Sequence, residues 1–251
     1  MDELRYTFVP DSHGQYERVA RMIDFHLDTG LTDHIVFLGD TLNGPSSAKL
    51  ISLIRSMGDL ATTIVGNHEW VARNALSDSI DPMVQIWRDE IWPGYEEDTL
   101  QSYGIHPTGK WERDAKALRE VMSERGDLVW LNSLEPYVTT KRHIGVHAGP
   151  EHNHPWVDQA AALDLLIGYD ARLHDEPTPI FSGQLGRVQP VPEAVDERTF
   201  VTGHLHLVLS ADERTANRKT CLASPLDKGA DLFVLQTGYE EVEDRIYAHA
   251  T

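Results

Sequence analysis

The chain has 251 residues, enough for one substantial domain or for one domain with an inserted cap. Its formal net charge of −18 argues against binding of nucleic acid through phosphate contacts, because such binding needs a basic surface. No apolar run reaches the roughly 18 residues that a membrane span requires.

The N-terminal part repeats one local pattern, in which a short apolar run ends in Gly, Asp, Asn or His and a turn or helix follows. Strands are expected at 6–9, 35–38 and 62–65. Helices are expected at 15–29 and from after Pro45 to near Gly58, because apolar residues recur there at helical spacing. Strands this apolar are buried on both faces, so the order predicts a β-α-β-α-β unit of an α/β fold.

From about 71 to 134 the pattern changes to charged, helix-like stretches that contain several tryptophans: Trp87, Trp92, Trp111 and Trp130. We interpret this range as an inserted helical cap. Strand character returns at 143–146 and 200–202, with a helix expected at 155–167 between them. The last part alternates strand-like runs with turns, at 219–223, 232–236 and 245–249, as an antiparallel sheet would.

Metal-binding side chains follow five of the expected strands. Ligands collect beyond the carboxyl ends of the strands in open α/β sheets, and imidazole with carboxylate and amide oxygens suits Mn, Fe or Zn. Neighbouring glycines at 14, 39, 66 and 203 allow tight turns there. Two such ions about 3.5–4 Å apart would activate a bridging water as an in-line nucleophile on phosphorus. The side chains are Asp11, His13, Asp40, Asn67, His68, His147, His204 and His206.

Each motif alone has a plainer explanation. Asp-x-His-Gly is often a turn, Asp after Gly often caps a helix, and histidines two apart on a strand share a face by periodicity alone. All five motifs in this order, each after a strand, favour a metal centre. Without His68, seven candidate ligands remain, which is more than one zinc ion holds, and this disfavours a mononuclear zinc hydrolase.

The motif order resembles the calcineurin-like metallophosphoesterase superfamily. It is most similar to the bacterial protein-phosphatase-type branch, which includes serine/threonine phosphatases and symmetrical diadenosine tetraphosphate hydrolases. The stretches 99–104, 131–137 and 146–149 resemble further motifs of that branch. The resemblance implies a four-layer α-β-β-α sandwich of the α/β class, with the metal ions at one end.

The resemblance also implies a role for each residue. Asp11 and His13 would bind the first metal, with His206 as a further candidate, and Asp40 would bridge both metals. The second metal would be bound by Asn67, His147 and His204. His68 would be a general acid or a donor to the phosphoryl oxygen, so His68, Asn67 and Asp40 are the expected catalytic residues. Manganese is the expected metal, with Fe, Zn and Mg as alternatives.

Two departures from the family pattern concern the substrate. The second motif, at 39–44, is one residue shorter than Gly-Asp-x-x-Asp-Arg-Gly and lacks its arginine. Asn43 stands where the family has the Asp that orients the catalytic His, and an amide stabilises an imidazolium less well than a carboxylate does. The missing arginine binds the substrate phosphate in relatives, and a second phosphate-binding arginine of the family also has no clear match in this sequence. Asn43 and Arg73 are therefore candidates for substrate binding, with Arg172 and Arg187 as other substitutes.

The expected function is hydrolysis of a phosphate ester or phosphoanhydride. A serine/threonine protein phosphatase, a hydrolase of dinucleoside tetraphosphates or other nucleotides, and a non-catalytic metal-binding scaffold remain alternatives. Missing clamp arginines weaken the protein-phosphatase interpretation, because a phosphomonoester dianion needs strong charge neutralisation. The expected partner is a small phosphorylated or nucleotide substrate, or a phosphoprotein. The oligomeric state is not predicted.

The cellular location is inferred from two features. Cys221 is the single cysteine, which excludes an intrachain disulfide and fits a reducing compartment. The first five residues lack the basic and apolar regions of a signal peptide. We expect a cytoplasmic protein.

Overall fold

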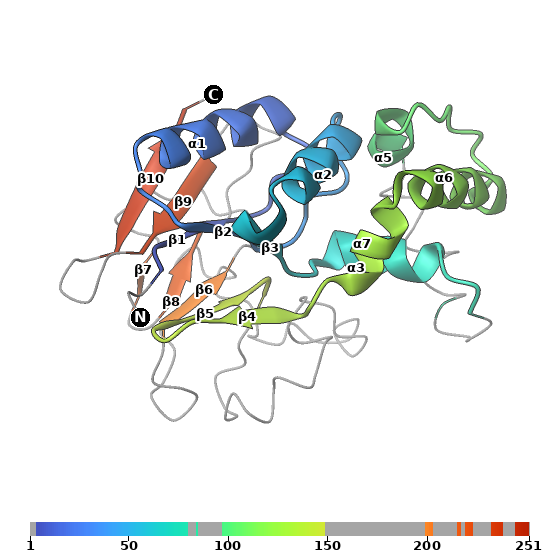
Figure 1. Ribbon diagram of the computed structural model, residues 1–251. Coiled ribbons are helices and arrows are strands. Elements are labelled where there is room, and N and C mark those ends of the chain that lie inside the picture. Colours follow the sequence, from blue (N-terminus) through green and yellow to red (C-terminus); the bar gives the residue numbers. More distant parts are fainter. Residues whose placement is uncertain are drawn as a thin grey trace.

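Two β-sheets with helices beside them organise the computed structural model (Figure 1). It describes residues 4–79, 84, 97–148, 199–202, 215–216, 219–222, 232–237 and 244–250. Among these residues no helix is long and apolar enough to cross a membrane. The α/β sandwich expected from the sequence is confirmed, whereas the helix expected at 155–167 lies outside the described residues.

The first sheet has the strand order β10-β9-β1-β2-β3. Strands β1, β2 and β3 run parallel, β9 pairs antiparallel with β1, and β10 pairs antiparallel with β9 at the other edge. Helices α1 and α2 connect the parallel strands and lie on one side of this sheet (Figure 1). The bounds are β1 Tyr6–Val9, α1 Tyr16–Asp28, β2 His34–Phe37, α2 Ser47–Ser56, a 3-10 turn Gly58–Leu60, β3 Ala61–Thr63, β9 Leu232–Gln236 and β10 Arg245–His249.

The second sheet has the order β4-β5-β6-β8-β7. Strands β5, β6 and β8 are parallel, with β4 and β7 antiparallel at the edges. The antiparallel pairing expected for the C-terminal runs is confirmed for β9 with β10 in the first sheet, whereas β8 lies parallel to β6 in this one. The bounds are β4 Tyr137–Thr139, β5 His143–Val146, β6 Thr199–Thr202, β7 Thr215–Ala216 and β8 Lys219–Cys221.

Along β1 and β2, successive apolar side chains point alternately to the two faces of the first sheet and pack against different elements. Phe8 and Val36 lie in the apolar cluster that also contains Val201 of β6, so they fill the space between the two sheets. Val9 and Ile35, their neighbours in the sequence, lie in the cluster formed with α1 and α2. Successive side chains of a strand point to opposite faces, so a strand that is apolar throughout is buried on both sides.

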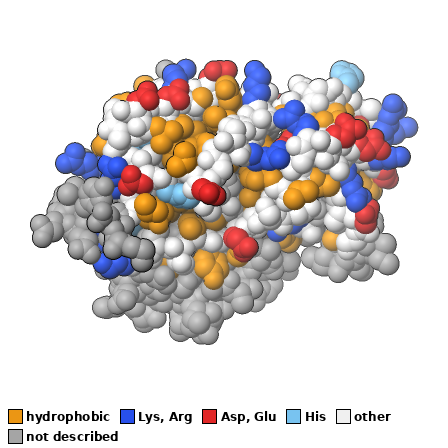
Figure 2. Space-filling model, viewed as in Figure 1, with side chains coloured by type: hydrophobic (Ala, Val, Ile, Leu, Met, Phe, Trp, Pro, Cys, Tyr) orange, Lys and Arg blue, Asp and Glu red, His pale blue; other side chains and the backbone are white. Residues whose placement is uncertain are grey.

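The described helices between β3 and β4 form a third apolar cluster beside the sheets (Figure 1). They are α3 Asn67–Ala75, α5 Glu97–Ser102, α6 Trp111–Arg125 and α7 Asp127–Ser133. Trp111 and Trp130 pack against this cluster. Figure 2 shows acidic and basic side chains intermixed over α6, on its outer face.

A buried carboxylate ties these helices to α2. Asp127 is fully buried and accepts hydrogen bonds from the guanidinium groups of Arg55 in α2 and Arg125 in α6. The Tyr103 hydroxyl donates to the same carboxylate at 3.0 Å. Burial and the charge of Asp127 raise the pKa of Tyr103 above its usual range, so the tyrosine stays a donor.

Candidate metal centre

The loops that leave β1 and β2 are bound to each other by their backbones. The amides of Ser12 and His13 donate to the carbonyl of Asp40, at 3.0 and 2.8 Å, and that of Gly14 donates to the carbonyl of Thr41. His13 and Asp40 both have positive φ, at 39° and 52°, a conformation that non-glycine residues seldom adopt. Such backbone persists where the surrounding structure holds it in place, and it is frequent at functional sites.

Glu69 in the first turn of α3 holds the second loop in this conformation. Its buried carboxylate accepts the backbone N–H groups of Asp40 at 2.7 Å, Thr41 at 2.8 Å and Leu42 at 3.1 Å. It also accepts the N–H of Gly66, the residue that precedes α3, at 3.1 Å. One carboxylate therefore fixes the loop after β2 to the start of α3.

Two glycines allow these loops to approach each other. A Cβ on Gly39, where φ is +92°, would come within 2.6 Å of two backbone atoms of Gly66. A Cβ on Gly66 would come within 2.5 Å of the Asp40 backbone nitrogen and closer still to its Oδ1. The motif residues next to these glycines are thus brought together by direct backbone contact.

One group of donors consists of Asp11, Asp40 and His147, whose ligand atoms all lie within 4.8 Å of one another. All three side chains are buried. The His147 Nε2 atom lies 3.5 Å from Asp40 Oδ2 and 2.8 Å from Asn67 Oδ1. Four of the residues expected from the sequence therefore converge, from the ends of β1, β2, β3 and β5.

The hydrogen bonds of His147 show that this donor set fits a cation. Its Nδ1 lies 2.8 Å from the carbonyl oxygen of Leu38, which can only accept, so a neutral ring carries its proton on Nδ1. Nε2 then presents a lone pair toward Asn67 Oδ1, and both facing atoms are acceptors. A carbonyl partner on the outer nitrogen is also the usual arrangement of a metal-binding histidine.

A second group consists of His13, Asp40 and His68, again with ligand atoms within 4.8 Å of one another. The rings of His13 and His68 meet edge to face, with centroids 4.8 Å apart. His13 Nδ1 lies 3.2 Å from the carbonyl oxygen of Leu42. His68 Nε2 lies 3.5 Å from Asp40 Oδ2, and the His68 amide donates to Asp40 Oδ1 at 3.0 Å. Asp40 belongs to both groups.

The electrostatics of Asp11 favour a bound cation. Burial, and then the nearby charge of Asp40, raise the pKa of Asp11 well above its usual range. Two buried carboxylates repel each other and lose their hydration, which costs free energy unless a positive charge lies between them. A divalent ion supplies that charge and keeps both groups ionised.

The other site residues expected from the sequence either lie outside the described residues or, in the case of Arg73, bind the backbone of another helix. His204 and His206, together with Arg172 and Arg187, lie outside the described residues. Arg73 is half-buried, and its guanidinium donates to the carbonyl oxygens of Leu131 and Leu134 at 2.8 and 3.0 Å. These bonds tie α3 to the end of α7, and burial lowers the pKa of Arg73.

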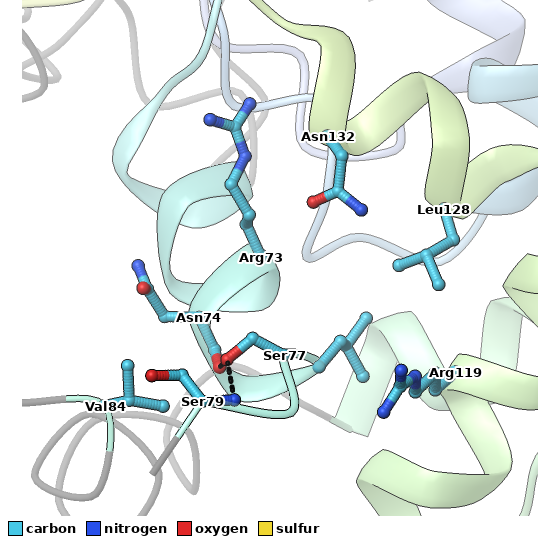
Figure 3. A pocket seen from close by; sticks show the side chains of 9 residues that line it. Arg73, Asn74, Ser77, Ser79, Val84, Arg119, Leu128 and Asn132 are labelled. Carbon is cyan, nitrogen blue, oxygen red and sulfur yellow. Dashed lines mark hydrogen bonds between the residues drawn. The ribbon is translucent and has the colours of Figure 1, made fainter. Parts of the chain in front are cut away.

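A hollow of about 380 Å³ lies beside the C-terminal end of α3, and Arg73 is one of the residues that line it (Figure 3). Asn132 reaches toward it from α7 and Arg119 from α6 (Figure 3). Arg119 forms an ion pair with Asp78. None of the residues of the two donor groups lines this hollow.

Sequence reasoning assigned no role to two residues that shape the centre. Glu69 follows directly after Asn67 and His68 in the sequence, and an acidic residue in the first turn of a helix was the available signal. Thr99 belongs to the stretch at 99–104 that resembled a family motif. Its hydroxyl donates to Asn43 Oδ1 at 2.6 Å, a contact between residues that are 56 positions apart.

Comparison with known proteins identifies the fold that carries this centre. The profile of the family described as calcineurin-like phosphoesterase matches residues 4–181, most of the chain. The chain belongs to the calcineurin-like phosphoesterase family. Among solved structures, a proposed diadenosine tetraphosphatase superimposes with a TM-score of 0.56 at 17% identity, covering 98% of this chain and 94% of that one. Membership of this family implies divalent metal ions as cofactors.

Two relatives match parts of this calcineurin-like phosphoesterase. The zinc-dependent endopolyphosphatase of Saccharomyces cerevisiae is 39% identical over 67 residues, which are 26% of this chain and 20% of the yeast protein. The symmetrical bis(5'-nucleosyl)-tetraphosphatase of Aeromonas salmonicida is 31% identical over 77 residues, 30% of this chain and 28% of that protein. The matches thus span less than a third of either relative.

Proposed function

We propose that the chain is a binuclear metal-dependent hydrolase of phosphoester or phosphoanhydride bonds. The observation that carries the proposal is the position of Asp40, whose carboxylate belongs to both donor groups. A shared carboxylate between two sets of imidazole and oxygen ligands is the arrangement that two adjacent divalent ions require. The family and its relatives named as phosphatases support the same reaction class.

The proposed assignment of ligands follows the family resemblance and divides the residues differently from the two groups, in which Asp11 lies with His147 and His13 with His68. Asp11 and His13 would hold the first metal, Asn67 and His147 the second, and Asp40 both, with His204 and His206 completing the set. When bound, two divalent ions clamp a phosphoryl oxygen and lower the pKa of a water for attack on phosphorus. We propose manganese as the native metal, although one relative is named for its dependence on zinc.

The protein side chains would orient the substrate and the ligands. Leu38 and Leu42 fix the rings of His147 and His13 through their carbonyl groups. His68 stands at the start of α3, where the helix dipole favours a negative charge such as a phosphate. Its ring lies beside the shared carboxylate, in a position to donate a hydrogen bond to a phosphoryl or leaving-group oxygen.

For the substrate we propose a small nucleotide or polyphosphate rather than a phosphoprotein. Two relatives are named for polyphosphate and dinucleoside tetraphosphate. The guanidinium of Arg73 is bound to α7 carbonyls, which supports a structural role instead of the phosphate clamp considered from the sequence.

We also propose that about 71–134 forms a cap on the metallophosphoesterase domain, and that the protein is cytoplasmic.

The test is an activity panel on the full chain loaded with Mn²⁺, Zn²⁺, Fe²⁺ or Mg²⁺. Substrates are diadenosine tetraphosphate, inorganic tripolyphosphate, a phosphodiester, an alkyl phosphomonoester and a phosphopeptide. We expect hydrolysis of the anhydrides to be fastest with Mn²⁺ and to fall by at least about 100-fold in Asp40→Asn. If the metal-loaded wild type hydrolyses none of them, the non-catalytic scaffold is the better explanation.

A further inference from the structure

A short chain of hydrogen bonds connects helix α5 to the ring of His68. The backbone N–H of Asn43 donates to the Thr99 hydroxyl at 3.1 Å, and that hydroxyl lies 2.6 Å from Asn43 Oδ1. The other end of the Asn43 side chain, Nδ2, lies 2.5 Å from His68 Nδ1. Three residues far apart in the sequence thus form one line of contacts that ends in the metal centre.

The chemistry of each group shows which atoms donate and which accept in this series of hydrogen bonds. The Thr99 hydroxyl has one proton, and it accepts the backbone N–H of Asn43 through a lone pair. Its proton is therefore available for Asn43 Oδ1, which only accepts. That bond directs the amide oxygen toward Thr99 and leaves the NH₂ group facing His68.

The facing NH₂ group determines which nitrogen of the ring is protonated. An amide NH₂ only donates, so His68 Nδ1 must be the acceptor, and a neutral ring then carries its proton on Nε2. Nε2 is the atom that lies 3.5 Å from Asp40 Oδ2, on the side of the donor groups. An aspartate at position 43 would do the reverse, because a carboxylate accepts and would require the proton on Nδ1.

We propose that Thr99 is a positioning residue that acts through Asn43 to hold His68 as its Nε2–H tautomer. The ring then serves as a neutral hydrogen-bond donor to the substrate. This inference rests on the proposed function. A neutral donor suits a leaving group that is stable as an anion, such as the phosphate of an anhydride, better than an alkoxide, which must receive a full proton.

The surroundings of Thr99 make the direction of its hydroxyl a fixed property of the fold. Thr99 and Leu100 are buried, so α5 is anchored in the helical cluster. Ser102, in the same helix, accepts the backbone N–H of Ala48 at the start of α2. Asn43 has φ +59°, a left-handed conformation that Asn adopts more readily than most residues. Asp tolerates that conformation too, so Asn43→Asp changes the chemistry and keeps the backbone.

The tautomer can be read directly by ¹⁵N NMR on the full chain with labelled histidine, loaded with diamagnetic Zn²⁺. The His68 signals are assigned by their loss in His68→Gln. We expect a protonated Nε2 and an unprotonated Nδ1 in the wild type, and the reverse in Asn43→Asp. Thr99→Val, which removes the hydroxyl, should give a mixture, and Thr99→Ser should restore the single form. A wild-type proton on Nδ1, or a Thr99→Val spectrum identical to the wild type, would overturn the proposal.

Kinetics provide the second arm. We expect Thr99→Val to lower kcat for tripolyphosphate about 10-fold with little change in KM, while Thr99→Ser stays near the wild type. The two failures are distinguishable. If no substrate is hydrolysed but the spectra are as expected, the positioning role stands and the proposed function fails. If the wild type is active but the spectra show the other tautomer, the positioning role fails alone.

Discussion

The carboxylate of Glu69 accepts the backbone N–H of Asp40 at 2.7 Å. Glu69 belongs to neither group of candidate metal ligands, yet it holds in place Asp40, which belongs to both. Asp40 has a positive φ, and the same carboxylate also binds the next two amides of its loop. The position of Asp40, the shared ligand, therefore depends on the buried carboxylate of Glu69 in the first turn of α3. Such supporting contacts commonly determine metal affinity.

The first prediction concerns this contact. Glu69→Gln keeps the shape of the side chain but places an NH₂ group opposite backbone donors. We expect Mn²⁺ affinity to fall about 10- to 100-fold in calorimetric titrations, because Asp40 is no longer held in place. Glu120→Gln, at an exposed position of α6, is the control and should bind as the wild type does. Unchanged affinity in Glu69→Gln would show that the loop keeps its shape without the anion.

A second prediction uses the close approach of Gly66 to the same aspartate. The φ of Gly66 is −100°, which alanine adopts without strain, so Gly66→Ala tests contact alone. Its Cβ would collide with the backbone nitrogen and Oδ1 of Asp40. We expect Gly66→Ala to lose Mn²⁺ binding.

Gly104→Ala is the matched control for this substitution. Gly104 has φ +76° and no atom within 4 Å of an added Cβ. It should lose about 1 kcal/mol of stability through backbone strain and keep its metal affinity. Equal Mn²⁺ affinity in the two variants would argue against a steric role for Gly66.

The sequence predicts the centre better than its surroundings, for a physical reason. Asp11, Asp40 and Asn67 follow parallel strands of one sheet, and the carboxyl ends of such strands meet at one edge, so their convergence follows from order alone. The contact of Asn43 with Thr99 depends on how the helical segment packs onto α2. No local pattern contains that information.

The C-terminal strands show the same limit. Residues 219–221 and 232–236 have strand-like sequences, which predicted strands correctly. Which sheet each strand joins depends on the free edges left by β1 and β6. Pairing between distant segments is set by tertiary packing, and strand character does not reveal it.

A third prediction concerns the anchoring of the helical cluster. Asp127→Asn removes the charge between Arg55 and Arg125 at a fully buried position. We expect a loss of about 3 kcal/mol in the free energy of unfolding, measured by urea denaturation, because the buried partner of two cations is lost. Asp78→Asn breaks an Asp–Arg pair at the surface and should cost less than about 1 kcal/mol. Similar losses in the two variants would contradict the anchoring role.

The last prediction is a pH dependence that arises away from the metal centre. His26 in α1 is buried, with its Nε2 3.2 Å from His249 Nε2 of β10 and its Nδ1 3.3 Å from the Thr7 hydroxyl. Burial, and then the proximity of His249, lower the pKa of His26 from 6.5 to about 4. Between these values the unfolded chain binds a proton that the folded chain does not. Stability therefore rises with pH through this window and is lost as pH falls from 6.5 toward 4.

The effect is measured by urea unfolding of the metal-free chain from about pH 4 to about pH 7.5, a range that covers both the unfolded and the folded pKa of His26. His26→Gln cannot titrate, so we expect it to lose less stability on acidification than the wild type, by up to about 3 kcal/mol. His106→Gln, at an exposed position, should keep the wild-type slope. If His26→Gln has the same pH dependence as the wild type, another group carries the proton, and the contact between α1 and β10 is not the acid-sensitive part of the fold.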